Sequence, residues 1–302
     1  MDLLHFILDL AALLLWLSWR AKPYDALATA TPATLVGTLR RAESPKVRRW
    51  HFLAALLGLL LLRAVLYRTL GSALNWTAQL NLVATSLAFK SDFFDRMLLF
   101  SGLSFGVTLA IFFLWLLLLS MLARSGSESA SIVRLARAHL GFVDGWPPVV
   151  KLLLPFVAAF IAWWGGSWPL AYIGMIPEPG SELVRVLQAA LVGLGSYLAW
   201  KYLVLALLGL HLIHNHVYFG PHPIWSFVDH AAKRLLTPLR FLPLRIARLD
   251  LAPVVGIALV WVITHAAAYG LRPPPRYDEK GRPMPPAFEI PGLADTFRRV
   301  SR

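Results

Sequence analysis

Six long apolar runs, separated by polar and mostly basic stretches, set the pattern of this chain. An α-helix needs about 20 apolar residues to cross a bilayer, so each run is predicted to span a membrane. Asp2 precedes the first run and Arg20 follows it, the reverse of the charge order in a secretory signal peptide, which predicts a retained helix. The predicted spans are residues 3–19, 50–70, 98–122, 147–166, 187–213 and 251–270.

Each pair of predicted spans encloses a polar, partly amphipathic connector. In the last connector, apolar residues recur at helical spacing, which predicts a helix lying in the membrane interface. These residues are Ile224, Val228, Ala231 and Leu235. The segments that open the fourth and sixth spans share the sequence Pro-Val-Val. The predicted fold class is an all-α polytopic membrane protein with about six transmembrane helices, arranged as three helix–amphipathic connector–helix repeats.

The predicted repeat units cover residues 1–70, 98–170 and 187–271. The first two are degenerate, and the third carries the pattern most clearly. Residues 272–302 form a Pro-rich tail, which is expected to be disordered because it offers little apolar surface to bury.

Composition strengthens the membrane interpretation. Hydrophobic residues make up 58% of the chain and charged residues 15%, whereas a soluble domain is about 45–50% apolar and about 25% charged. Fifteen Lys and Arg fall in the connectors, residues 20–49, 123–146 and 214–250, and three in the loops 71–97 and 167–186. The positive-inside rule therefore predicts cytoplasmic connectors and an outside N-terminus, although seven basic residues in the tail count against it. The net charge of +13 is assigned to anionic lipid and cytoplasmic loops, not to nucleic acid.

Three charged residues are identified inside the predicted spans. Asp9 and Arg63 lie at matching depths, roughly 9–10 Å from the outer ends of antiparallel spans, and are predicted to pair. The pair is interpreted as a lock between helices, with a solute or proton path and snorkelling as alternatives. Lys201 has no acidic residue at its depth, so it is expected to snorkel or to bind a lipid phosphate or an anionic cofactor.

Four histidines gather where the fifth span meets the cytoplasm: His211, His214, His216 and His222. His211 and His214 share a helix face, and imidazoles bind haem iron, copper or zinc, so these two are weak metal candidates. The favoured interpretation is interfacial histidine. There is no Cys, and no nucleotide loop, catalytic triad or pair of catalytic carboxylates is recognisable, so no enzyme activity and no cofactor are expected.

Aromatic residues and glycines in the spans are assigned structural roles. Five tryptophans lie where an aromatic belt would anchor the helices, at Trp50, Trp146, Trp163, Trp164 and Trp168. Four glycines are expected to let helices approach closely, at Gly102, Gly106, Gly193 and Gly195. Pro155 is expected to be the single interruption of a span.

Residues 222–266 resemble the YggT family of small membrane proteins, also called YlmG-type. The resemblance rests on Pro223-Ile224, Pro238-Leu239-Arg240, Pro243 and Asp250-Leu251-Ala252-Pro253. The chain departs from the family pattern at Ala252, where serine is usual, and at Arg248-Leu249, where glycine and isoleucine are usual. Asp250 is expected to cap the last span, with Pro253 in its first turn.

The resemblance implies a non-enzymatic scaffold or assembly factor in the cytoplasmic (inner) membrane of a bacterium. It associates the chain with envelope organisation, osmotic stress or haem-protein biogenesis, and with membrane lipids and other membrane proteins as partners. The residues expected to face lipid or a partner are Lys201, Lys233, Arg234, Arg240, Arg245 and Asp250. Two alternatives stay open, a transporter or channel for small solutes or ions and a haem- or metal-handling protein.

Overall fold

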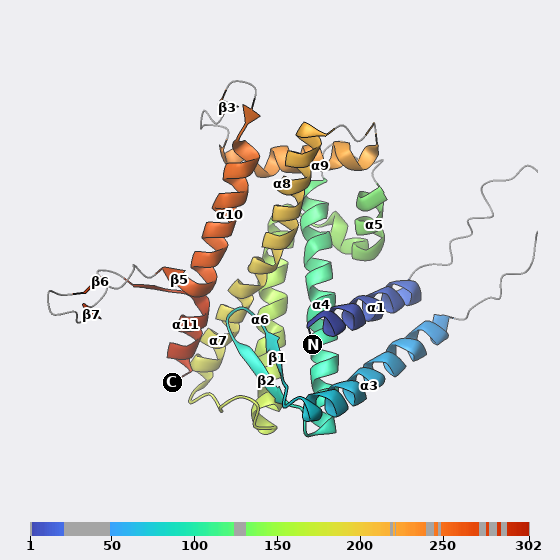
Figure 1. The fold of residues 1–302 in the computed structure, drawn as a ribbon, viewed down its shortest axis with the longest axis vertical. Coiled ribbons are helices and arrows are strands. Elements are labelled where there is room, and N and C mark those ends of the chain that lie inside the picture. The colour runs from blue at the N-terminus through green and yellow to red at the C-terminus, as the bar shows by residue number, and fades with distance from the viewer. Residues whose placement is uncertain are drawn as a thin grey trace, which may run out of the picture. The chain divides into compact units, whose positions relative to one another are not determined.

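The computed structural model describes residues 2–20, 49–123, 131–217, 220, 222–239, 245–246, 249–271, 276–277, 283–284 and 289–301. Its long helices are α1 (Asp2–Arg20), α3 (Arg49–Ala73), α4 (Phe94–Leu122), α6 (Pro148–Tyr172), α7 (Glu182–Ser196), α8 (Trp200–His216) and α10 (Ala252–Tyr269) (Figure 1). The shorter helices are α5 (Ser131–Leu140), α9 (Pro223–Leu235) and α11 (Leu293–Val300), with 3-10 turns η1 (Gly141–Gly145), η2 (Tyr197–Ala199) and η3 (Thr237–Leu239).

Short strands occur only between helices in the part of the chain that the structure describes. β1 (Thr77–Asn81) and β2 (Ser86–Lys90) form a two-stranded sheet that the sequence analysis did not predict. The other strands are two residues long and pair antiparallel, β3 (Arg245–Ile246) with β4 (Leu249–Asp250), β5 (Gly270–Leu271) with β8 (Ile290–Pro291), and β6 (Arg276–Tyr277) with β7 (Pro283–Met284).

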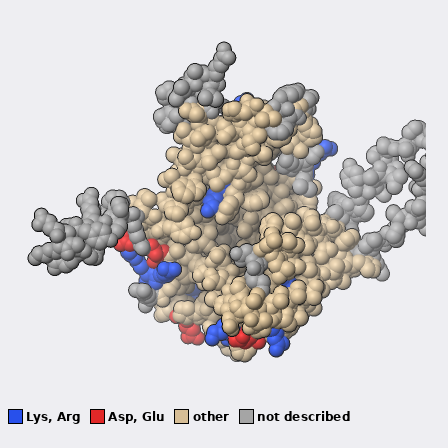
Figure 2. Space-filling model, viewed as in Figure 1, with Lys and Arg blue, Asp and Glu red and all other residues tan. Residues whose placement is uncertain are grey.

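Six helical segments among the described residues are long and apolar enough to cross a membrane. They are Leu3–Arg20, Trp50–Ala73, Phe94–Leu122, Pro148–Tyr172, Glu182–His216 and Ala252–Tyr269. Most of the face shown in Figure 2 carries neither basic nor acidic side chains, as expected of surface that meets lipid. The prediction of six spans is confirmed, and the protein is a multi-pass membrane protein.

The chain folds as two compact units. Unit 1 comprises Met1–Ala78 and Ala88–Ala110, and unit 2 comprises Gln79–Leu87 and Ile111–Arg302. In unit 1, α1 packs along α3, and an aromatic cluster of Tyr67, Trp76, Phe89 and Phe100 fills the space beside them. In unit 2, α6 packs along α7, and α8 packs against both α9 and α10. The three predicted repeats stay a prediction.

The amphipathic helix α9 uses its apolar face inside the protein. Val228 and Ala231, two residues of the predicted stripe, are buried together with Phe227 against Ala123 and Leu207. Figure 1 shows α9 lying across the end of α8. The expectation that this stripe lies in lipid is therefore wrong for the buried part of the stripe, because packing on neighbouring helices removes the same apolar surface from water.

Three local expectations about helix ends and interruptions need correction. The N-cap of α10 is Leu251, without a side-chain hydrogen bond, so Asp250 lies one residue too early to cap it and belongs to β4. Pro253 does fall in the first turn, as predicted. The fifth span is interrupted by the 3-10 turn η2 between α7 and α8, whereas α6 continues through Pro155, so the expectation that Pro155 is the single interruption is wrong. Such a mid-span turn often marks strain or a hinge.

Three side-chain expectations are also corrected. Trp163 does not face lipid, since only 5% of it is exposed and its ring meets the edge of Phe297 at 5.6 Å. Phe297 belongs to α11, so residues 293–300 of the tail are helical, not disordered. Neither Gly102 nor Gly106 has another described atom within 4 Å of the position a Cβ would take, so these two glycines do not mark a close helix contact.

Gly193 does mark a close approach, as predicted, and its replacement by alanine is expected to destabilise the protein. A Cβ there would lie 2.9 Å from Cδ2 of the Phe156 ring and 3.1 Å from the Phe156 carbonyl oxygen. Overpacking of this kind costs about 1–3 kcal/mol of unfolding free energy. Gly209→Ala is the matched control, because nothing described lies within 4 Å of that position. Denaturant unfolding in micelles checks this, and equal stability of the two variants would contradict it.

Candidate functional site

Unit 1 contains a buried polar cluster centred on Arg63, whose side chain is fully buried. Arg63 Nη1 donates to Asp9 Oδ1 at 2.5 Å, so the structure brings together the two residues expected to pair. Nε donates to the Tyr67 hydroxyl at 3.0 Å, and Nη2 donates to Ser104 Oγ at 3.0 Å. Nη2 also lies 2.8 Å from His5 Nδ1. All three guanidinium nitrogens therefore have partners, contributed by α1, α3 and α4.

His5 completes this cluster in a defined tautomer. A guanidinium can only donate, so Nδ1 of His5 accepts from Arg63 and Nε2 carries the proton. That nitrogen lies 3.3 Å from Asp9 Oδ2 and 3.1 Å from Ser104 Oγ. The sequence analysis missed His5, Ser104 and Tyr67, although His5 stands four residues before Asp9 on one helix face, which is a usable signal. The cluster pairs one negative with one positive charge and fixes three helices against one another.

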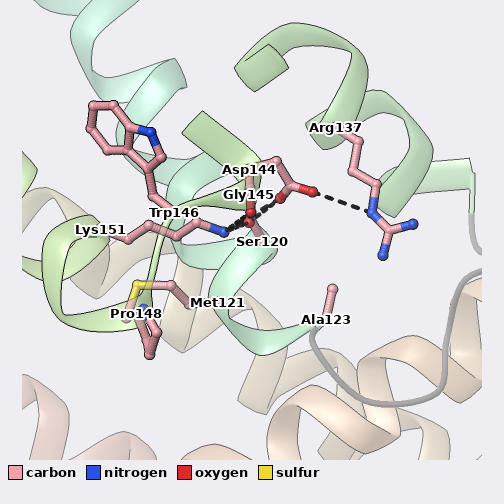
Figure 3. Close-up of a pocket in the computed structure, with 9 residues that line it drawn as sticks. All are labelled: Ser120, Met121, Ala123, Arg137, Asp144, Gly145, Trp146, Pro148 and Lys151. Atoms are coloured by element: carbon pink, nitrogen blue, oxygen red, sulfur yellow. Dashed lines mark hydrogen bonds and ion pairs between the residues drawn. The ribbon is translucent and has the colours of Figure 1, made fainter. Parts of the chain in front are cut away.

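A second polar cluster, in unit 2, is built around Lys151 in the first turn of α6 (Figure 3). Lys151 Nζ donates to Ser120 Oγ at 2.7 Å and to the Asp144 carbonyl oxygen at 2.6 Å. It lies 3.5 Å from Asp144 Oδ1, to which the Ser120 hydroxyl also donates. Arg137 Nε approaches the other carboxylate oxygen from the opposite side, at 3.4 Å. One carboxylate thus holds two cations.

The Lys151 cluster joins the connector between α4 and α6 to both spans. Ser120 comes from α4, Arg137 from α5, Asp144 from η1 and Lys151 from α6. They border a cavity of about 170 Å³, whose other lining residues are Met121, Ala123, Gly145, Trp146 and Pro148. Lys151 lies within the predicted span 147–166 and is buried. The sequence analysis, which identified three charged residues inside the spans, therefore missed this one. The sequence did contain a nearby acidic residue, Asp144, seven residues before Lys151, which could have been proposed as the ion-pair partner of this lysine.

The histidines of α8 are engaged by α9. His211 Nδ1 lies 2.9 Å from Asp229 Oδ1, and its Nε2 lies 3.4 Å from Asn215 Nδ2. His214 stacks on the ring of Trp225, with centroids 5.2 Å apart. Among the described residues no group of three or more His, Cys, Asp or Glu is placed to hold a metal ion. These contacts hold α9 on the end of α8.

Asp229 sets a pH dependence for the docking of α9. Burial raises the pKa of its carboxyl, but the hydrogen bond and charge of Lys233, at 2.5 Å, and the charges of His211 and His214 lower the pKa below its usual value of 3.8. A lowered folded-state pKa stabilises the fold above the unfolded-state pKa, and this contribution is lost as pH falls through the folded-state value. Wild type is therefore expected to exceed Asp229→Asn in stability at pH 6, and the difference is expected to shrink as pH falls below 3.8 and to vanish only below the folded-state pKa. Unfolding in micelles at both pH values checks this, and a difference that grows on acidification would contradict it.

The remaining predicted site residues are dispersed. Lys201 Nζ lies 4.8 Å from the centroid of the neighbouring Tyr202 ring. Arg234 Nη1 donates to the carbonyl oxygen of Leu122 at 2.8 Å, so it ties α9 to the end of α4. Lys233 is exposed and pairs with Asp229.

The residues of the YggT-like motif are described in part. Pro223 lies in the first turn of α9, and Pro238 and Leu239 lie in η3, with Leu239 buried. Arg245 and Asp250 are partners in the register of β3 with β4. Arg240 and Pro243 lie outside the described residues.

Comparison with known proteins adds no relative. No protein-family model, no curated protein and no solved structure matches this chain. The resemblance of residues 222–266 to the YggT family stays a prediction that rests on the motif residues alone.

Proposed function

We propose that this chain is a non-enzymatic membrane scaffold or assembly factor of the YggT type, acting in the cytoplasmic membrane of a bacterium. The observation that carries the proposal is the completeness of the Arg63 cluster. Every nitrogen of a fully buried guanidinium has a partner on α1, α3 or α4. A transporter needs an intramembrane charge that can exchange partners with a solute, whereas a charge held from three helices favours one fixed packing.

The cations of the connectors, not their apolar stripes, are the proposed contacts with anionic lipid. The apolar face of α9 is already occupied by α8 and the end of α4. Lys233 is exposed on the same helix and can reach the headgroups. The motif resemblance associates this role with envelope or division-site organisation, osmotic-stress tolerance or haem-protein biogenesis.

A transporter or channel for small solutes or ions is the second candidate, favoured by one observation. The 3-10 turn η2 breaks the fifth span, and transporters build their binding sites from such broken helices. The Lys151 cluster in the same unit would then supply a buried charge.

Flux and cross-linking distinguish the two candidates. For a scaffold, proteoliposomes are expected to leak protons and K⁺ no faster than protein-free liposomes. Photo-cross-linkers at Val254 and Trp261, exposed and seven residues apart on one face of α10, are expected to capture the same membrane protein in cells. Ile263, exposed on another face of α10, is the control position and is expected to capture none. Flux that Lys151→Met abolishes would instead support the transporter.

A further inference from the structure

Unit 2 contains a second cavity, of about 270 Å³, next to the C-terminal helix α11. The turn between β1 and β2, the segment after α6, and helices α6, α7 and α11 all contribute to its wall. Figure 1 shows α11 lying beside α7 and the end of α10. This cavity shares no residue with the Lys151 cluster.

The wall of this cavity combines apolar side chains with hydrogen-bond donors. The lining residues Leu87, Ile176 and Phe297 are apolar, and the lining residues Ser86 and Trp163 have side chains that carry an O–H and an N–H group. None of the described residues that line it is acidic. A site with donors and without a carboxylate favours a ligand that accepts hydrogen bonds and carries negative charge.

Trp163 provides an unused donor. The residue is 5% exposed, and its indole N–H has no hydrogen-bond partner among the described residues. Leaving a buried donor unpaired is costly, and native proteins rarely do so. The edge contact with Phe297 holds the ring in place, so this buried donor keeps its position beside the cavity.

Gln188 and Ser301 fix the position of α11 over the cavity. Gln188 is buried and its Nε2 donates to Ser301 Oγ at 3.0 Å. Ser301 Oγ in turn donates to the Phe297 carbonyl oxygen at 2.7 Å. This chain of hydrogen bonds joins α7 to the last turn of α11, which preforms the wall before any ligand arrives.

Arg298 supplies the positive charge. It lines the cavity, is exposed, and makes no ion pair with a described residue. Its neighbour Arg299 lies instead 4.0 Å from Glu289 Oε1. The two arginines therefore differ in their surroundings although they stand side by side on one short helix.

We propose that this cavity binds an amphipathic anion, a carboxylate or phosphate group joined to an apolar chain. Arg298 and the Trp163 N–H would receive the anionic group, and the side chains of Ile176 and Phe297 would cover the apolar part. A volume of about 270 Å³ lies just below the usual range of small-molecule sites, which suits a short chain or one end of a longer one. The anion can come from the bilayer, as an anionic lipid, or from water, as a soluble carboxylate. The assignment does not depend on the scaffold proposal.

Two probes test the site with the full chain in nanodiscs of phosphatidylcholine. Calorimetric titration with decanoate measures binding of a water-soluble anion, and native mass spectrometry after addition of phosphatidylglycerol counts retained anionic lipid. Binding of one probe by the wild type identifies the source, and Arg298→Gln and Trp163→Phe are each expected to weaken that binding by about tenfold. Arg299→Gln and Trp164→Phe are the matched controls and are expected to bind as wild type does. Failure of both probes to bind, or equal binding by all four variants, would overturn the assignment.

The thermal stability of the unliganded variants keeps this test independent of folding. Phenylalanine keeps an aromatic ring against Phe297, but it lacks the fused five-membered ring of indole, so Trp163→Phe removes the N–H donor and also leaves a small void. Unliganded Trp163→Phe is therefore expected to unfold at a somewhat lower temperature than wild type, whereas Arg298→Gln, at an exposed position, is expected to unfold at the wild-type temperature. Wild-type binding by Arg298→Gln of unchanged thermal stability would overturn the assignment to a ligand.

Discussion

Arg63→Met is expected to lower the unfolding free energy by about 3–5 kcal/mol, which is a large share of the stability of a typical protein. Methionine fills similar space but leaves the Asp9 carboxylate, 8% exposed, without its cation. An uncompensated buried charge is far more costly than the loss of an exposed ion pair. Unfolding of the purified protein by denaturant in mixed micelles measures the loss.

Two further variants test whether the loss of stability in Arg63→Met comes from the broken ion pair or from replacing any arginine of α3. Arg68→Met lies on the same helix, is exposed, and is expected to change stability by no more than about 0.5 kcal/mol. The double variant Asp9→Leu with Arg63→Met removes both charges and is expected to be more stable than Arg63→Met alone. Equal stability of Arg63→Met and Arg68→Met would contradict the central role of this pair.

Lys151→Met is expected to lower the unfolding free energy by about 2–3 kcal/mol. The change removes the donor to Ser120 Oγ and to the Asp144 carbonyl oxygen and leaves Arg137 as the remaining cation on the Asp144 carboxylate. The expected loss is smaller than that for Arg63 because the Asp144 side chain is 24% exposed and water can solvate it. The same micelle unfolding assay checks this.

Lys201→Met is the matched control for Lys151→Met. Lys201 also lies in a predicted span of unit 2, but the contact described for it is the neighbouring Tyr202 ring. Its removal is expected to cost about 1 kcal/mol or less. A loss at Lys201 as large as the loss at Lys151 would mean that Lys201 holds a charge partner or lipid that matters to folding.

The Asp9–Arg63 contact could be predicted because depth along a helix follows from position in the sequence. Two opposite charges at matching depth in neighbouring antiparallel spans have few other partners. The three other members of the cluster could not be chosen in the same way. Whether His5, Tyr67 and Ser104 face Arg63 depends on the rotation of each helix about its axis, which only packing fixes.

The Lys151 cluster was missed for a related reason. Lys151 stands in the first turn of its helix, where a basic residue is ordinarily taken as a charge at the membrane surface. Its burial depends on η1 folding back so that Asp144 faces the helix start. Nothing in the local pattern of hydrophobic residues specifies that turn.

The sequence by itself determined the class of protein and its six spans, because the length and polarity of a segment decide whether it can cross a bilayer without help from neighbours. It also determined that α9 is an amphipathic helix. Only the tertiary structure decided what covers the apolar face of α9, which packs against Leu207 and Ala123. It likewise decided that Trp163 is buried beside α11 instead of facing lipid. The physical reason is that lipid tails and protein interiors are almost equally apolar, so hydropathy gives the membrane span but not the partner of each face.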